Sequence, residues 1–327
     1  MIDVALPLIG GLVLLVLGGE LLVRGAVQVA TRFGVSPLVI GLTLVGFGTS
    51  TPELVTSVQA ALSGSPGIAY GNIVGSNIAN ILLILGAAAV LTPIAVASNA
   101  LKRDSAVMVA VAVAFAVAAA LMPLGILIGL VFVAFLAFYV FAAFRQERQA
   151  ATDDHGAVYD KTIAAQEVDP ALVPVARPER SIAFSLFVAV AGLALVVLGG
   201  YFLVDGAVTL ARSLGVTETV IGLTIVAVGT SMPELVTSIM AAIRKETDVA
   251  FGNIVGSNIY NILGIGGVTA LIAPTQVPFE IVSFDNLVMI AASILLVVFA
   301  YTGRRISRLE GGLLVLCYVG YVAWIWP

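Results

Sequence analysis

The sequence predicts an all-α, polytopic membrane protein with ten transmembrane helices, arranged as two inverted five-helix repeats. The first observation is composition: hydrophobic residues make up 60% of the 327-residue chain, charged residues only 10%, and the mean hydropathy is +1.13. An ordinary water-soluble domain carries roughly a quarter charged residues. The second is that apolar runs of about 20 residues, long enough to cross a bilayer core, recur along the chain. The third is that one half of the sequence repeats in the other.

Ten apolar stretches are expected to cross the membrane, five on each side of a charged segment. The fourth and fifth belong to one long run, which we divide where Pro123 and Gly125 interrupt helical structure. The N-terminal stretch lacks the basic region of a signal peptide and recurs later in the chain, so we expect it to be a span rather than a cleaved leader. The expected spans are 4–30, 35–62, 68–92, 105–122, 124–144, 182–212, 216–243, 249–273, 286–301 and 311–326.

The chain therefore divides into a first repeat (1–144), a charged linker (145–180) and a second repeat (181–327). The linker mixes acidic and basic residues with Ala and Pro, which predicts a solvated segment. Because each repeat has an odd number of spans, the second repeat enters the membrane with the opposite orientation. With the N-terminus outside, 14 of the 15 Lys and Arg residues lie on the cytoplasmic side, as the positive-inside rule requires. We therefore expect an outside N-terminus and a cytoplasmic linker.

The composition also excludes several kinds of site. Cys317 is the one cysteine and His155 the one histidine, so a disulfide framework, a Cys- or His-based metal cluster and a Ser–His pair within the spans are excluded. A net charge of −4 gives no sign of a nucleic-acid partner. The partner that the composition indicates is the lipid bilayer.

The two halves align without a gap when the sequence is shifted by 181 residues. Of the 40 positions in the first repeat motif (41–80), 25 are identical in the second repeat motif (222–261), which indicates an internal duplication. The identities gather in two short blocks of each motif. The first block reads GTSTPELVTS at 48–57 and GTSMPELVTS at 229–238, and the second reads GNIVGSNIAN at 71–80 and GNIVGSNIYN at 252–261.

Each first block places an acidic residue, Glu53 or Glu234, directly after a proline inside an apolar span. An ionised carboxylate there costs several kcal/mol unless it is compensated, and a cation is the obvious compensating group. The proline removes a helical hydrogen bond and frees carbonyls of the preceding turn, while the Gly-Thr-Ser before it adds hydroxyls. Ca²⁺ and Na⁺ prefer such oxygen ligands. The alternative interpretation is a pair of protonated carboxylic acids bonded to backbone.

Each second block lies on the following span and offers further oxygen ligands. Ser76 and Asn80, matched by Ser257 and Asn261, are four residues apart and therefore share a helix face. The glycines of this block are also spaced by four, which suits close helix packing. The alternative for these glycines and for Asn72 is thus packing and backbone bonding, whereas we expect Asn80 and Asn261 to belong to an ion site.

With these motifs the sequence resembles the calcium/cation antiporter superfamily, and within it the prokaryotic sodium/calcium exchangers. The paired blocks are similar to the two repeats of that family, and the ten-span layout agrees along nearly the whole chain. The resemblance implies a secondary active transporter, not an enzyme, that exchanges Na⁺ for Ca²⁺ by alternating access across a prokaryotic plasma membrane. It implies no cofactor besides the transported ions and no required oligomer. Exchange of about three Na⁺ per Ca²⁺ would move one net charge per cycle.

The resemblance also implies a central Ca²⁺ site with two flanking sodium sites. The Ca²⁺ ligands would be Glu53, Glu234 and the backbone oxygens of Thr49 and Thr230. One sodium site would comprise Ser50, Ser76 and the Gly46 carbonyl. The other would comprise Ser231, Ser257 and the Ala227 carbonyl. Asn80 and Asn261 would line the centre.

Two departures from related families bear on the coupling ion. Asn261 stands where potassium-dependent relatives carry Asp, which argues against K⁺ co-transport. Proton-coupled relatives tend to carry Asn in place of the Thr-Ser of the first block, which favours Na⁺. A proton/calcium antiporter is the first alternative and a channel the second. An intramembrane protease is the third, although no buried His or Gly-Asp pair supports it.

Overall fold

The computed structural model describes residues 2–33, 40, 43–44, 46–96, 99–149, 155–173, 181–302 and 305–326. In this part of the chain, eight helices are long and apolar enough to cross a membrane, and a bent helix pair forms a ninth candidate span. The expected span 35–62 lies partly outside the described residues. The prediction of a multi-pass helical protein is therefore confirmed, and the tenth span stays a prediction.

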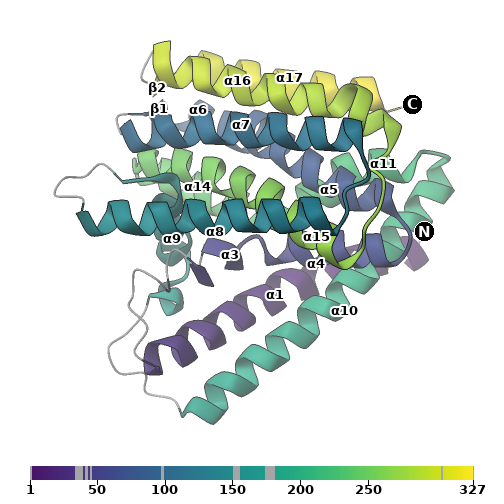
Figure 1. Cartoon of the computed structure of the whole chain (residues 1–327), viewed down its shortest axis with the longest axis horizontal. Helices are drawn as coiled ribbons and strands as arrows, with labels where there is room; N and C mark the ends of the chain where they lie inside the picture. Colours follow the sequence, from purple (N-terminus) through teal and green to yellow (C-terminus); the bar gives the residue numbers. More distant parts are fainter. Residues whose placement is uncertain are drawn as a thin grey trace.

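Within the described residues, the first half of the chain contains six α-helices besides the long N-terminal one, and Figure 1 shows how they are arranged. The long apolar run divides where the sequence predicted, because one helix ends at Leu121 and the next begins at Ile126. The elements are α1 (Ile2–Arg32), α3 (Gly46–Gly48), α4 (Thr51–Leu62), α5 (Pro66–Ala79), the π-helix η2 (Asn80–Leu85), α6 (Gly86–Leu91), α7 (Asn99–Leu121) and α8 (Ile126–Gln149).

The second half follows the same order after a linker that contains α9 (Ala157–Val168) and the short 3₁₀ helix η3 (Pro170–Leu172). Two-residue strands β1 (Ile94–Ala95) and β2 (Arg305–Ile306) pair in antiparallel register and join the halves at one end. The elements are α10 (Ile182–Leu214), α11 (Glu218–Ile221), the π-helix η4 (Gly222–Val226), α12 (Ala227–Thr230), α13 (Met232–Ile243), α14 (Thr247–Ile259), the π-helix η5 (Tyr260–Gly266), α15 (Gly267–Ile272), the π-helix η6 (Ile281–Asp285), α16 (Asn286–Thr302) and α17 (Arg308–Ile325).

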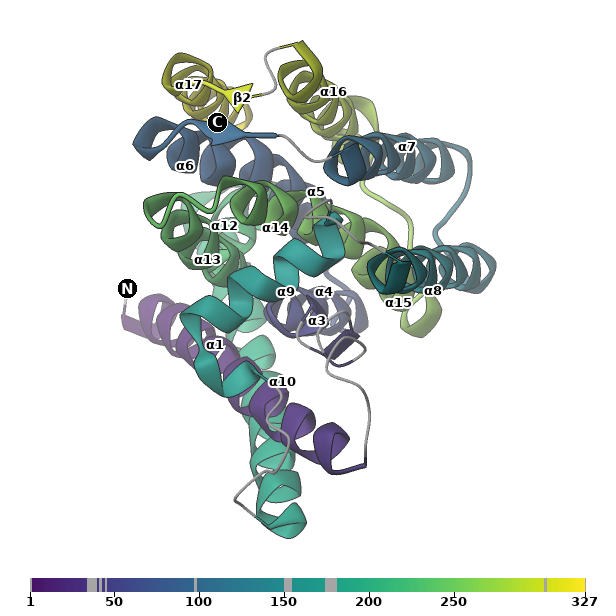
Figure 2. The same ribbon diagram turned by 90° about the vertical axis from the view of Figure 1, so that its left-hand side faces the viewer.

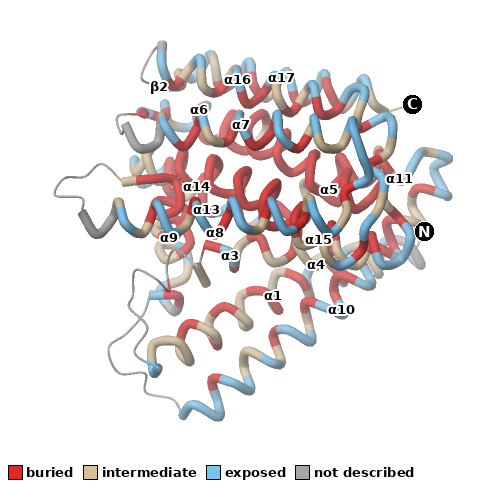
Figure 3. Tube along the Cα trace, viewed as in Figure 1, coloured by how far each residue is buried: buried red, intermediate tan, exposed pale blue. Residues whose placement is uncertain are grey.

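Two spans form the centre of the bundle. In an 18-residue apolar segment of each span, the buried share is 83% for the span from Pro66 to Leu91 and 89% for the span from Thr247 to Ile272. The corresponding shares for α1 and α10 are only 28% and 22%. Figure 3 shows this contrast between the inner and outer helices. The inner spans carry the second sequence blocks, so the serines and asparagines of these blocks occupy the most protected place in the fold.

The long helices α1 and α10 pack against each other as an antiparallel pair beside the bundle (Figures 1 and 2). Their backbones approach closely at glycines: a Cβ on Gly18 would lie 2.7 Å from the Val196 nitrogen and 2.8 Å from the Gly192 carbonyl oxygen. Gly11 meets the Gly199 carbonyl oxygen in the same way, at 2.8 Å. These glycines are repeat partners under the 181-residue shift, so the contact is nearly symmetric.

The described middle of the linker is buried, where its charges predicted a solvated segment. Its helix α9 packs against α13 and α14 and lies between the α1–α10 pair and the rest of the bundle (Figure 2). Lys161, Ala157 and Val158 are fully buried, and Asp160 is 4% exposed. The expectation of solvation fails because the middle of the linker has enough small and apolar residues to form a packed helix.

We expect the α1–α10 pair to tolerate no added methyl group at its closest approach. Gly18→Ala should lower the thermal unfolding midpoint in detergent, because overpacking of this kind costs roughly 1–3 kcal/mol. Gly10→Ala is the matched control, since a Cβ there meets nothing within 4 Å. Equal midpoints for the two variants would contradict the tight antiparallel contact.

Candidate cation-binding site

Each copy of the first block forms a break between two helices. In the first half, α3 ends at Gly48 and α4 begins at Thr51 with Pro52 in its first turn. In the second half, α12 ends at Thr230 and α13 begins at Met232 with Pro233 in its first turn, and the chain bends by 50° there. Proline suits a first helical turn because its missing N–H needs no partner there.

Both acidic residues lie in the first turn of the helix that follows the break. Glu53 and Glu234 are each only 1% exposed. The N-terminus of a helix presents backbone N–H groups and the positive end of the helix dipole, both of which favour a nearby negative charge. The break therefore places a carboxylate deep in the protein, with partial compensation from its own helix.

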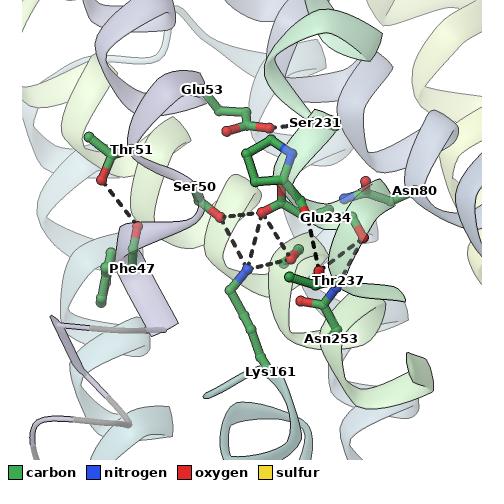
Figure 4. A network of polar contacts seen from close by, with 12 residues as sticks. Phe47, Ser50, Thr51, Glu53, Asn80, Lys161, Ser231, Glu234, Thr237 and Asn253 are labelled. Carbon is green, nitrogen blue, oxygen red and sulfur yellow. Dashed lines mark hydrogen bonds and ion pairs between the residues drawn. The ribbon is translucent and has the colours of Figure 1, made fainter. Parts of the chain in front are cut away.

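The two breaks face each other and exchange hydrogen bonds (Figure 4). The Ser50 hydroxyl donates to Glu234 Oε1 at 3.2 Å, and the Ser231 hydroxyl donates to Glu53 Oε1 at 3.0 Å. Each bond is the image of the other under the repeat shift. The hydroxyl of one half thus contacts the carboxylate of the other, and this brings the two acids to one centre.

One asparagine of each second block hydrogen-bonds to the helical turn that carries the acidic residue. Asn72 on α5 donates to the Glu53 carbonyl at 3.2 Å and to Ser57 Oγ at 3.0 Å. Asn253 on α14 repeats these bonds to the Glu234 carbonyl at 3.3 Å and to Ser238 Oγ at 2.8 Å. The interpretation of Asn72 as a backbone-bonding residue is therefore confirmed: it positions the turn that carries the acid.

The central amides also connect the two halves. Asn80 Nδ2 donates to Asn258 Oδ1 at 3.0 Å, and Asn258 Nδ2 donates to the Asn77 carbonyl at 3.3 Å. Asn80 begins the π-helix η2, and Asn261 lies at the start of η5. Short π-helical segments inside α-helices are rare and often occur at functional sites.

Several oxygens of the site point into buried space with no hydrogen-bond donor among the described residues. Buried acceptors are nearly always paired, and leaving one without a donor costs about 1–3 kcal/mol. Bound cations would satisfy such acceptors, so the residues present fit a cation such as Ca²⁺ or Na⁺. These atoms are Thr49 Oγ1, Glu53 Oε2, Asn80 Oδ1, Glu234 Oε2 and Asn261 Oδ1.

The described residues contain no cluster of three or more His, Cys, Asp or Glu side chains. A cation at this centre would have the carboxylates of Glu53 and Glu234 and otherwise neutral oxygens around it. That ligand set suits a hard cation such as Ca²⁺ or Na⁺ better than a transition metal, which prefers imidazole or thiolate.

The serines expected at the flanking sites are grouped differently from the prediction. The Ser76 hydroxyl donates to the Ala227 carbonyl of the other half at 3.4 Å, rather than joining Ser50. Ser50 and Ser257, one from each half, share a single partner instead. These hydrogen bonds join residues of opposite halves because the two motifs cross, so that each helix break lies against the inner span of the opposite half. Which of these oxygens bind one sodium ion stays a prediction. Of the remaining expected ligands, Thr230 donates to Asn72 Oδ1 at 3.0 Å, and Gly46 is buried at the start of α3.

That shared partner is Lys161 of the linker helix α9, a residue that sequence reasoning missed. Its ammonium lies 3.2 Å from Glu234 Oε1 and 3.3 Å from Ser50 Oγ, and it also donates to Ser257 Oγ (Figure 4). Both Lys161 and Glu234 are almost fully buried, at 0% and 1% exposure. A signal was present: Lys161 is followed by the apolar run TIAA in a segment otherwise interpreted as solvated.

Comparison with known proteins agrees with a cation-binding centre in a membrane protein. The sequence model of the family described as "Sodium/calcium exchanger protein" matches residues 4–145 and 184–326. The chain is 38% identical to Sodium/calcium exchanger MaX1 of Methanosarcina acetivorans over 97% of each chain, and 37% identical to Putative antiporter CaxA of Alkalimonas amylolytica over 95% of each. A solved structure of the sodium-calcium exchanger NCX_Mj superposes with a TM-score of 0.62, at 31% identity and covering 98% of both chains.

The apolar bundle and its buried pair of carboxylates define a polytopic membrane protein built around a candidate cation centre. The relatives are membrane transporters, and the match extends over nearly the whole sequence. The chain belongs to the sodium/calcium exchanger family and is a membrane ion transporter.

We expect both carboxylates to be required for Ca²⁺ binding. Glu53→Gln and Glu234→Gln should each weaken Ca²⁺ binding to the purified protein by at least about 10-fold, or about 1.4 kcal/mol, because each removes one of two buried negative charges. Calorimetric titration with Ca²⁺ measures this directly. Glu280→Gln, which changes an exposed residue, should bind as the unsubstituted protein does. Unchanged affinity in either site variant would exclude that carboxylate as a ligand.

Proposed function

We propose that this protein exchanges Na⁺ for Ca²⁺ across a prokaryotic cell membrane by alternating access. The observation that carries the proposal is the set of buried, donor-free oxygens around two facing carboxylates. Such a centre is unstable when empty, because a buried ionised carboxylate costs several kcal/mol without a partner charge. A transporter with this centre crosses between its two states only when loaded, and that makes exchange obligatory.

The ion sites follow from the contacts between the halves. Glu53 and Glu234, with the backbone oxygens of Thr49 and Thr230, hold Ca²⁺. One sodium site combines Ser50, Ser257 and Glu234, whose oxygens converge on one point in the structure. The other lies near Ser76 and the Ala227 carbonyl, with Ser231 and Glu53 beside it. Asn80 and Asn261 line the space between them.

The same contacts support two repeats of opposite orientation, and the distribution of Lys and Arg residues favours an outside N-terminus and a cytoplasmic linker. Repeat partners make reciprocal bonds across the centre, and α1 and α10 pack in antiparallel fashion. An inverted repeat can present the same site to either side of the membrane by exchanging the conformations of its halves. The α1–α10 pair, joined by its glycines and lying beside the bundle, is the unit that we expect to move.

Sodium is the coupling ion that the site chemistry favours. Ser50 and Ser231 bring neutral hydroxyl oxygens to each carboxylate, and Na⁺ binds oxygen ligands of this kind. Two carboxylates neutralise one Ca²⁺, so exchange for about three Na⁺ moves one net charge per cycle, worth about 2.3 kcal/mol per 100 mV.

We expect proteoliposomes loaded with Na⁺ to accumulate Ca²⁺ when diluted into Na⁺-free medium. Vesicles that contain the same concentration of choline should not accumulate it, and neither should vesicles that hold a pH gradient alone. Uptake of radioactive calcium measures the flux. Uptake driven by pH without Na⁺ would replace the proposal with proton/calcium antiport, and Ca²⁺ flux independent of any counter-ion would indicate a channel.

The charge carried per cycle gives a separate expectation. A potassium diffusion potential set with valinomycin, positive inside for Na⁺-loaded vesicles, should speed Na⁺ exit and Ca²⁺ entry, because the net positive charge then leaves. The opposite potential should slow the same uptake. An initial rate that does not respond to potential would show electroneutral exchange of two Na⁺ per Ca²⁺.

A further inference from the structure

We propose that Lys161 is a tethered cation that occupies one sodium position of the exchange site, and that α9 must leave before ions enter from the linker side. The inference rests on the proposed function and adds an occupant to its site. An ammonium and a Na⁺ ion carry the same charge and bind the same kind of oxygen, so they compete for one position.

The first observation is the coordination of the ammonium. Lys161 Nζ contacts one carboxylate oxygen and two hydroxyl oxygens, from Glu234, Ser50 and Ser257, on three different elements. The three N–H donors of a lysine match three acceptors. The Tyr260 ring adds a cation–π contact, with its centroid 5.9 Å from Nζ. The position is thus built for one positive charge.

The second observation is a break in the symmetry of the centre. Gly71 and Gly75 of α5 receive the backbone of η4, so that a Cβ on Gly71 would lie 2.9 Å from the Leu223 nitrogen. Their repeat partners Gly252 and Gly256 instead receive the linker helix, and a Cβ on Gly252 would lie 2.3 Å from Asp160 Cβ. A segment from outside both repeats therefore fills a groove whose counterpart holds a part of the repeat itself.

The third observation is that α9 is held by polar contacts at both ends. At its start, Asp104 of α7 accepts a hydrogen bond from the Ala157 backbone N–H at 2.8 Å, which caps the helix from another element. Beyond its end, Asp169 pairs with Arg24 of α1 at 2.6 Å. The contact at the start of α9 is buried, whereas the Arg24–Asp169 pair beyond its end is partly exposed, so α9 docks through polar contacts with α7 and α1 as well as through its small apolar residues.

Glu167 adds to the contacts at the end of α9. It lies 3.6 Å from Arg244, in the turn between α13 and α14. Partial burial and the neighbouring Glu246 carboxylate raise the pKa of Glu167 to about 7. At this end of α9, Arg244 attracts the Glu167 carboxylate, while the neighbouring Glu246 carboxylate disfavours the ionised form of Glu167.

The fourth observation is the space beside the helix. A cavity of about 590 Å³ lies between α1, the two helix breaks and α9, and its lining includes Thr49 and Pro52 as well as Ala165 and Asp169. Linker residues thus form one wall of a space that borders the site. Withdrawal of α9 would open that wall and free Ser50, Ser257 and Glu234 for an ion.

A shared ligand explains why the ammonium and Ca²⁺ exclude each other. Both need the Glu234 carboxylate, and the ammonium already lies 3.2 Å from its Oε1 atom. Docked α9 therefore opposes cation binding, and bound cations oppose docking. By linkage the two effects are equal in free energy.

The first test measures equilibrium binding of Na⁺ and of Ca²⁺ to the purified full-length protein. Lys161→Gln removes the competing charge and should lower the dissociation constant for both ions by at least about 10-fold, since the site no longer has to be vacated. Gly252→Ala keeps the lysine but obstructs the seat of α9, and it should act in the same direction. Lys102→Gln, which removes a partly exposed lysine at the start of α7, is the matched control and should bind as the unsubstituted protein does.

Binding that is unchanged or weaker in Lys161→Gln would overturn the inference, provided that the variant unfolds in saturating Ca²⁺ at the same temperature as the unsubstituted protein. A variant that folds only with cation present would support it, because Na⁺ or Ca²⁺ then replaces the missing ammonium beside Glu234.

The second test asks whether α9 moves. Ala165, which is 3% exposed, is replaced by Cys in a Cys317→Ser background, and labelling by a membrane-impermeant maleimide is timed in proteoliposomes whose linker side faces out. Na⁺ or Ca²⁺ should speed labelling at least about 10-fold over choline, because cations displace the helix. A labelling rate that does not change with these ions would show a permanently docked α9 and overturn the inference.

Sodium-driven Ca²⁺ uptake by the same vesicles distinguishes failure of this inference from failure of the proposed function. If the vesicles take up no Ca²⁺, the proposed function fails; if they take it up but labelling is unchanged, only the role of Lys161 fails.

Discussion

The constraint on which the rest of the structure depends is the burial of two carboxylates at facing helix breaks. Water screens neither of them, so every polar group nearby is committed to their support: hydroxyls from the opposite half, amides behind the breaks and the N-terminal turns of α4 and α13. These partners still leave oxygens of the centre without donors. The centre is therefore stable only with a positive charge in it, and the structure supplies one from its own chain, Lys161.

The duplication explains how so polar a centre is assembled inside an apolar protein. A single copy has one acid, one proline break and one asparagine span, and it cannot surround an ion. Two copies that cross give each acid a hydroxyl from its partner, and the same 181-residue shift relates both bonds. The inner spans, which are more than four-fifths buried, then exclude water and lipid from the centre (Figure 3). The glycines of α1 and α10 give the outer pair a contact of similar symmetry.

Lys161 changes how the linker is understood. Charge alone assigned residues 145–180 to solvent, yet α9 lies against α13 and α14 and reaches the centre of the transporter (Figure 2). A lysine can be buried when its ammonium finds a carboxylate and enough oxygen acceptors, and this site offers both. The three residues that hold the ammonium, Ser50, Glu234 and Ser257, are also those of the proposed sodium site.

The sequence by itself determined the membrane class, most of the span boundaries, the duplication and the identity of the two acids, because hydropathy, proline breaks and repeated motifs act locally along the chain. It also indicated Asn72 as a backbone partner. Only the tertiary structure decided which serines meet, because the grouping of Ser76 with Ala227 depends on how two distant motifs cross. It likewise decided that Lys161 lies at the centre: the burial of a charge depends on which distant oxygens surround it, and no local pattern in the linker encodes those partners.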